Sequence, residues 1–113
     1  MPRVRSAVSK TVSSRAQLGS IGKVSGFFVN TQDGRVATRS QLTEVGLFDP
    51  EDGPSSPWHP IQGPSDASTM WYAVLRKRVR GVFIGQLTVR HVGRQASLEE
   101  QGWEEVPMES IGV

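Results

Sequence analysis

The sequence predicts a mainly β fold, a small sheet or open barrel of two hairpins with a short C-terminal helix and extended arms. Two stretches, 24–39 and 71–92, each contain two strand-like runs joined by a turn with glycine. Residues 49–69 are rich in proline, and the helices that the sequence indicates are short. The 113 residues suffice for one modest core. We therefore expect a basic N-terminal arm over 1–23 and a single β-rich domain over 24–113.

The first predicted hairpin spans residues 24–39. Asp33-Gly34 lies between two apolar runs, and both residues accept the positive φ of a tight turn. Residues 40–48 are ambiguous, because Ser40 and Gly46 fit the ends of a short helix whereas Val45 to Phe48 fit a strand. We expect a short helical turn followed by extended chain.

Residues 49–69 are expected to form a long loop. Its first part contains Pro50, Pro54, Pro57, Pro60 and Pro64. Proline cannot donate a backbone hydrogen bond, so neither a helix nor a central strand is expected there. Trp58 and Ile61 are apolar residues within this loop. They pack either at the edge of the domain's own core or against a partner, where Trp is enriched.

The second predicted hairpin, residues 71–92, is the most informative stretch because it is strongly basic and has no acidic residue. Arg76, Arg78 and Arg80 are two positions apart, so on a strand they point the same way. A two-residue Arg80-Gly81 turn fits local turn chemistry but scatters charge over both faces. A turn with an odd number of residues separates the faces, and we expect that register because a misplaced apolar face is costly. Its apolar face carries Trp71, Ala73, Leu75, Val79, Phe83, Gly85, Leu87 and Val89, with His91 at its edge, and its cationic face carries Tyr72, Val74, Arg76, Arg78, Ile84, Gln86, Thr88 and Arg90.

The C-terminal residues 97–113 are predicted to form a short helix and an acidic tail. Ser97-Leu98-Glu99-Glu100 matches a capping box, so the helix should start at Leu98, and Gly102 should end it. After Pro107, Ile111 and Val113 are expected to dock on a sheet edge.

Charge is strongly segregated, although the formal net charge is only +2. Residues 1–23 and 71–96 contain basic but no acidic residues, and 97–113 contain acidic but no basic residues. These segments can neutralise one another within a chain, bind a neighbouring chain, or bind other partners. An acidic tail in the same chain favours protein contacts over nucleic acid.

The sequence offers little for catalysis or cofactor binding. There is no cysteine, which excludes disulfides, thiolate metal sites and cysteine nucleophiles. His59 and His91 are the only histidines, and no nucleophile elbow accompanies them. Clustered metal ligands and a phosphate-binding loop are also missing. We expect a non-enzymatic protein with no cofactor, no metal and no small-molecule substrate.

We therefore expect a structural or adaptor subunit of a larger assembly, such as a virus or phage particle, that docks through its arms and cationic hairpin. Its partners would be protein subunits, including further copies of itself. No apolar run suggests a membrane span or a signal peptide, so we expect it in the cytoplasm or within a virus particle. The expected partner-binding residues are Arg76, Arg78, Arg80, Arg90, Tyr72 and Trp58. The alternative is a nucleic-acid-binding protein that uses Arg3, Arg5, Lys10, Arg15, Arg76, Lys77 and Arg78.

Overall fold

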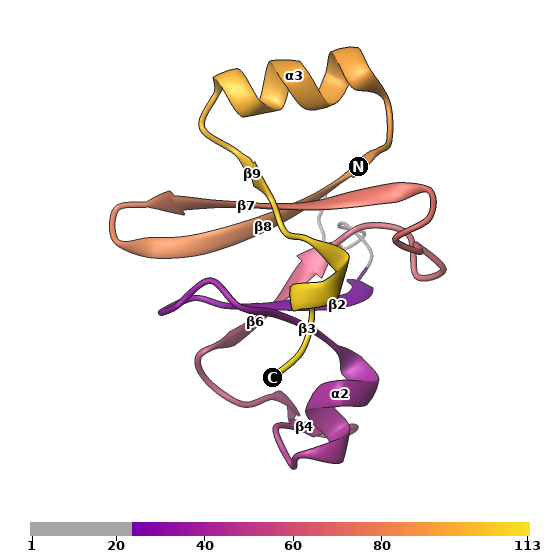
Figure 1. Cartoon of the computed structure of the whole chain (residues 1–113). Helices are drawn as coiled ribbons and strands as arrows, with labels where there is room; N and C mark the ends of the chain where they lie inside the picture. The colour runs from indigo at the N-terminus through magenta and orange to yellow at the C-terminus, as the bar shows by residue number, and fades with distance from the viewer. Residues whose placement is uncertain (1–23) are drawn as a thin grey trace, which may run out of the picture.

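A computed structural model describes residues 24–113 (Figure 1), so the predicted basic arm lies outside the described residues. The mainly β class and the short C-terminal helix are confirmed. The elements are β2 (Val24–Asn30), β3 (Val36–Thr38), α2 (Arg39–Glu44), β4 (Phe48–Asp49), β5 (Gly53–Pro54), β6 (Trp58–Gln62), β7 (Tyr72–Val79), β8 (Val82–Val89), α3 (Val92–Glu100), β9 (Glu104–Glu105) and the 3-10 helix η1 (Met108–Ser110).

The strands form two three-stranded antiparallel sheets, β3-β2-β6 and β8-β7-β9, and a small β4-β5 pair. Figure 1 shows the layers: α3 lies above β8-β7-β9, the β3-β2-β6 sheet lies below it, and α2 and β4 are at the bottom. The two predicted hairpins therefore belong to different sheets, which pack face to face. One apolar cluster fills the space between the sheets, and a second lies between the lower sheet and α2.

The first hairpin forms as predicted, with β2 antiparallel to β3. Its loop is longer than a tight turn: Gly34 has a φ of +80°, and Asp33 keeps a negative φ. The Asn30 side chain accepts hydrogen bonds from the backbone N–H groups of Gln32 and Asp33, at 3.0 and 3.1 Å. The loop is thus held by its own polar side chains.

The helical turn predicted after this hairpin is confirmed as α2, but Thr38 rather than Ser40 caps it. The Thr38 hydroxyl accepts from the Gln41 N–H at 3.2 Å, and the Gln41 side chain accepts from the Thr38 N–H at 2.8 Å. This is a reciprocal capping box. Leu42 is fully buried, and Gly46, with a φ of +79°, lies just beyond the end of the helix.

The prediction of a continuous loop over 49–69 was wrong. This segment contains β5 and β6, and β6 pairs with β2. Pro60 is tolerated because β6 is an edge strand of its sheet. Trp58 and Ile61 are buried, at 5% and 1% exposure, so both belong to the domain's own core.

The predicted register of the second hairpin was also wrong. Val79 pairs with Val82 and Arg78 with Phe83, so Arg80-Gly81 is a two-residue turn. Both turn residues have positive φ, 54° and 83°, as a type I′ turn requires. Local turn chemistry, which favoured this turn, therefore prevailed over the argument from one apolar face.

The physical reason is that this hairpin is covered on both faces. Val74 belongs to the core between the sheets, whereas its neighbour Leu75 points to the opposite face and is also fully buried. Figure 1 shows α3 and the chain through β9 on that second side. Because apolar residues are needed on both faces of the hairpin, the register could not be chosen by placing all apolar residues on one face.

On the face of β8 that meets the lower sheet, each close contact joins a large side chain to a glycine. A Cβ built on Gly85 would lie 2.5 Å from Ile61 Cδ1. The Leu87 and Phe83 side chains lie equally close to Gly63 and Gly34, where a Cβ would come within 2.6 and 2.9 Å of them. Three glycines thus allow the two sheets to approach closely.

The C-terminal segment differs from prediction at its start. Helix α3 begins at Val92, not Leu98, because His91 Nδ1 accepts from the Arg94 N–H at 3.4 Å and caps the helix. The expectation of His91 as a core-edge histidine was also wrong, since it is exposed. The end was predicted correctly, with Gly102 following the cap. Ile111 packs against the core and the Gly112 N–H donates to the Val36 carbonyl at 2.8 Å, but Val113 is exposed.

The glycine contacts predict a specific effect of Gly85→Ala. The new methyl group would overlap the buried Ile61 side chain, so the free energy of unfolding should fall by about 1–3 kcal/mol in urea denaturation. The matched control is Gly93→Ala in α3, where a Cβ meets nothing closer than 3.5 Å. It should raise the stability by about 0.5–1 kcal/mol through helix propensity. Equal effects of the two substitutions would contradict this account of the packing.

Candidate interaction site

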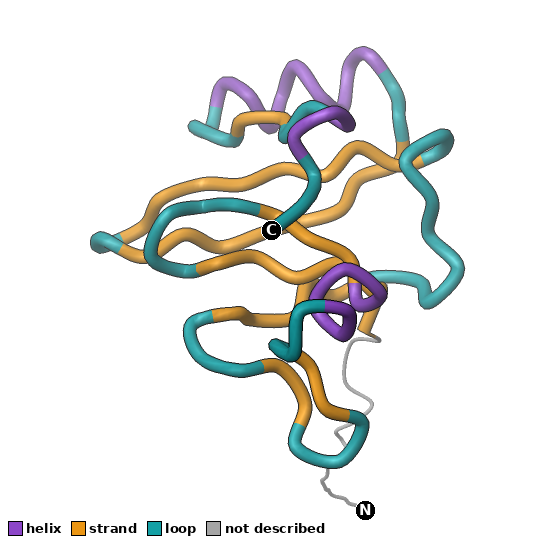
Figure 2. The backbone as a smooth tube through the Cα atoms, turned by 60° about the horizontal axis from the view of Figure 1, so that its bottom comes forward, coloured by secondary structure: helices purple, strands orange, loops and turns teal. Residues whose placement is uncertain are grey.

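The strongest candidate site is the end of the β7-β8 hairpin, residues 77–84, which we call the hairpin tip. It comprises the last residues of β7, the Arg80-Gly81 turn and the first residues of β8. Figure 2 shows this tip beside the loop that joins β2 to β3. The Phe83 N–H donates to the Thr31 carbonyl at 2.9 Å, which fixes the tip to that loop.

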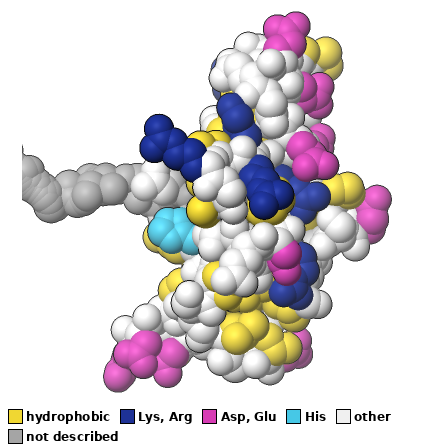
Figure 3. All heavy atoms as spheres, turned by 90° about the vertical axis from the view of Figure 1, so that its left-hand side faces the viewer, with side chains coloured by type: hydrophobic (Ala, Val, Ile, Leu, Met, Phe, Trp, Pro, Cys, Tyr) yellow, Lys and Arg dark blue, Asp and Glu magenta, His cyan; other side chains and the backbone are white. Residues whose placement is uncertain are grey.

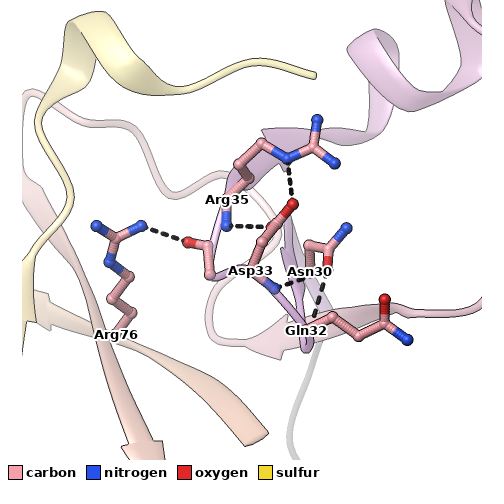
Figure 4. A network of polar contacts seen from close by, with 6 residues as sticks. Asn30, Gln32, Asp33, Arg35 and Arg76 are labelled. Carbon is pink, nitrogen blue, oxygen red and sulfur yellow. Dashed lines mark hydrogen bonds and ion pairs between the residues drawn. The ribbon is translucent and has the colours of Figure 1, made fainter.

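Arg76 and Arg78 share one face of β7, as predicted, and both lie over the Phe83 ring. Their guanidinium carbons are 5.9 and 5.7 Å from the ring centroid, within the range of a cation–π contact. Arg76 also donates to the Gly34 carbonyl in the β2–β3 loop (Figure 4). Arg76 therefore ties the two sheets together. Within residues 24–113 the Arg78 guanidinium makes neither a hydrogen bond nor an ion pair, and it contacts the Phe83 ring.

The acidic tail neutralises two of the predicted arginines within the chain. Arg76 Nε lies 3.2 Å from Glu104 Oε1, and Arg90 Nη1 lies 2.9 Å from Glu105 Oε2. Both glutamates belong to β9, which pairs with β7. Arg76 and Arg90 are therefore neutralised by glutamates of the same chain, which is one of the three alternatives that the charge segregation left open.

Three cations of the tip form no ion pair with any residue between 24 and 113: Lys77, Arg78 and Arg80. They do not form one row. Arg78 lies over Phe83, Lys77 is on the opposite face with its Nζ 5.9 Å from the Trp103 ring centroid, and Arg80 projects from the turn. The predicted row of three arginines is thus reduced to Arg76 and Arg78, with Arg80 beyond its end.

Arg80 occupies an unfavourable backbone position. Its φ of 54° makes it the only described non-glycine residue in the left-handed region. Asn or Gly would suit this turn position better, because a larger side chain there costs about 1 kcal/mol or more. A cation at a place where the backbone favours another residue is typical of a functional position.

Exposed apolar side chains accompany these cations. Val79, Val82 and Ile84 are 37%, 45% and 41% exposed. Val79 pairs directly with Val82, and Ile84 pairs with Lys77, so all three lie on one face of the hairpin. Figure 3, which views the molecule from the side where the hairpin turns, shows Lys and Arg side chains gathered in the middle with hydrophobic atoms beside them. The tip is therefore cationic and apolar together.

The remaining predicted site residues do not join this tip. Trp58 is in the core, so its indole is not available to a partner. Tyr72 is six positions from Arg78 along β7, about 20 Å at 3.3 Å per residue. Arg90 lies beyond the far end of β8, where its Nε donates to the Thr69 carbonyl at 2.8 Å. Arg3, Arg5, Lys10 and Arg15 fall outside the described residues.

Sequence reasoning missed the exposed apolar side of the tip. The signal was present in the Arg80-Gly81 turn, because that register pairs Val79 with Val82 and Lys77 with Ile84. Accepting the local turn would have placed these residues on one face near the end of the hairpin. The expected register instead placed Val79 on the apolar face and Ile84 on the cationic face, so these residues did not come together.

The described part of the chain contains no group of three or more His, Asp or Glu side chains placed to hold a metal ion. Nor do residues 24–113 include a helix with the length and apolarity needed to cross a membrane. Comparisons of the chain with protein-family models, with curated proteins and with solved structures found no match.

The different surroundings of the two stacked arginines predict different effects on stability. Arg76→Met should lower the free energy of unfolding by about 1–2 kcal/mol, because it removes the bonds to Glu104 and to the Gly34 carbonyl. Arg78→Met, the matched control, should change it by less than about 0.5 kcal/mol. Urea denaturation of the two variants measures the difference, and a larger loss for Arg78→Met would refute these assignments.

Proposed function

We propose that this chain is a non-enzymatic subunit of a larger protein assembly, which docks by placing its hairpin tip on an acidic protein surface. The observation that carries the proposal is the combination at the tip: cations without an acidic partner among the described residues, beside exposed Val79, Val82 and Ile84. An acidic protein surface with apolar residues in it complements both features.

The apolar side chains favour a protein partner over nucleic acid. Phosphate contacts use cations and hydrogen-bond donors, and recognition of single strands adds aromatic rings that stack on bases. The exposed apolar residues of the tip are aliphatic, and the only tyrosine, Tyr72, is distant from it. Burial of aliphatic groups gains free energy against a protein surface but has no equivalent role against a phosphate backbone.

The tip is also preorganised for docking. The type I′ turn fixes its end, the Phe83 ring supports the guanidinium group of Arg78, and the Phe83 N–H is bonded to the neighbouring loop. Side chains that are already ordered lose less entropy on binding. The unfavourable backbone position of Arg80 is consistent with a residue kept for contact rather than for stability.

The test is the self-association of the purified protein, since further copies of this chain are among the proposed partners. We expect association measured by light scattering at micromolar concentration, weakened by salt because it depends on charge. Arg78→Glu/Arg80→Glu should weaken it about tenfold or more, because the variant presents carboxylates to an acidic surface. The control Arg39→Glu changes an exposed cation of α2, away from the tip, and should leave it unchanged.

A second variant separates docking from folding. Arg80→Asn places a residue favoured in this turn, so it should raise the stability while weakening association. A labelled single-stranded RNA serves as the competing probe. If the wild-type protein is monomeric and binds the RNA in a salt-dependent manner that Arg78→Glu/Arg80→Glu abolishes, the proposal of an assembly subunit is wrong and nucleic-acid binding replaces it.

A further inference from the structure

The outer edge of β8 differs from the other edges of the two main sheets. The C-terminal segment covers β3 through the hydrogen bond from Gly112 to Val36. Pro60 in β6 has no N–H to offer, and β9 is only two residues long with a glutamate at each. By contrast β8 has eight residues, none of them charged and none proline. Short, charged or proline-containing edges prevent pairing with another chain, and β8 lacks each of these features.

The hydrogen-bond pattern of the hairpin shows which backbone groups face outward. In a two-residue hairpin, Val79 and Val82 exchange backbone bonds, so the even-numbered residues of β8 bond to β7. Odd-numbered residues then point away from β7, and the bond from the Phe83 N–H to Thr31 shows this direction. The N–H and C=O groups of Gly85, Leu87 and Val89 point the same way, and no residue within 24–113 bonds to them.

Two shallow grooves follow this edge and together extend from Ile84 to Val89. The first lies between Ile84–Gln86 and the β6 residues His59, Pro60 and Gln62. The second lies between Gln86–Val89 and the α3 segment at His91 and Arg94. An extended strand that fits both grooves would lie along the unpaired backbone groups of β8, which is the arrangement of strand addition.

We infer that β8 pairs antiparallel with β8 of a second copy of this chain, forming one continuous sheet across a two-fold axis. In such an isologous contact each residue meets its own copy or a close neighbour in sequence, so charged residues in the strand would repel each other. The absence of charge from all of β8 makes the strand complementary to itself. This contact uses a surface different from the hairpin tip.

The outward groups define the register. With the axis at Leu87, Leu87 faces Leu87 of the partner subunit, and Gly85 faces Val89 of the partner subunit. Each of these pairs can exchange two backbone hydrogen bonds. Gln86 then lies opposite Thr88 of the partner subunit in a pair without backbone bonds, where side chains are closest.

The experiment uses sedimentation velocity of the full chain from low to high micromolar concentration, with amide hydrogen exchange of Gly85, Leu87 and Val89. We expect a dimer that persists in high salt, where association through the charged tip is weakened, because β8 is uncharged. The edge amides should become slow to exchange as this dimer forms. Val89→Pro removes an outward N–H that the hairpin itself does not use, and Gln86→Lys adds a charge diagonally across the axis from its own copy. Each should raise the dimer dissociation constant by about tenfold or more.

The control Gln101→Lys adds the same charge at an exposed position at the end of α3, outside both the paired segment and the hairpin tip, and should leave the dimer intact. Circular dichroism melts verify that the variants fold. If Val89→Pro does not fold, Gln86→Lys still tests the inference. A monomer at all concentrations overturns it, whether the edge amides exchange fast or are protected by another segment of the same chain. A dimer that survives both edge substitutions but is lost in Arg78→Glu/Arg80→Glu also overturns it and leaves only docking through the tip.

Discussion

The close packing of β8 on the β3-β2-β6 sheet is the contact on which the rest of this structure depends. Phe83, Gly85 and Leu87 occupy alternate positions on one face of β8, and each meets a partner in the lower sheet or its loops. At each contact one of the two partners is a glycine. Side chains of ordinary size at both positions would hold the sheets farther apart, because protein interiors have little free space.

This packing also places the candidate site. Phe83 rests on Gly34 in the β2–β3 loop and supports Arg76 and Arg78 from below. Arg76 is used internally, through Glu104 and the Gly34 carbonyl, whereas Arg78 is left to the solvent side. The same contact that holds the two sheets together therefore separates a structural arginine from one available for binding.

The sequence was informative where the determinants are local. The hairpin at 24–39 follows from its apolar runs and Gly34, and the short helix after it follows from a polar cap and Gly46. The end of α3 follows from Gly102. Its start was missed because histidine is an uncommon cap and Gly93 weakens the helix signal. β6 was missed because Pro60 suggested a loop, although an edge strand tolerates proline.

What the sequence could not show depends on contacts between distant segments. The register of the second hairpin was misjudged because nothing local shows that both of its faces are covered, one by the lower sheet and the other on the side of α3. The pairing of Arg76 and Arg90 with Glu104 and Glu105 likewise requires β9 to lie along β7. Charge segregation predicted that these groups would be matched, but not that one chain would match them.

Cross-strand NMR contacts in the second hairpin test this account most directly, because the sheet packing and the tip both depend on its register. The structure predicts a strong nuclear Overhauser effect between the Hα atoms of Arg78 and Phe83, together with contacts from Gly85 Hα to the Ile61 δ-methyl group. An Hα contact between Arg78 and Ile84 instead, as a three-residue turn would give, would contradict the account.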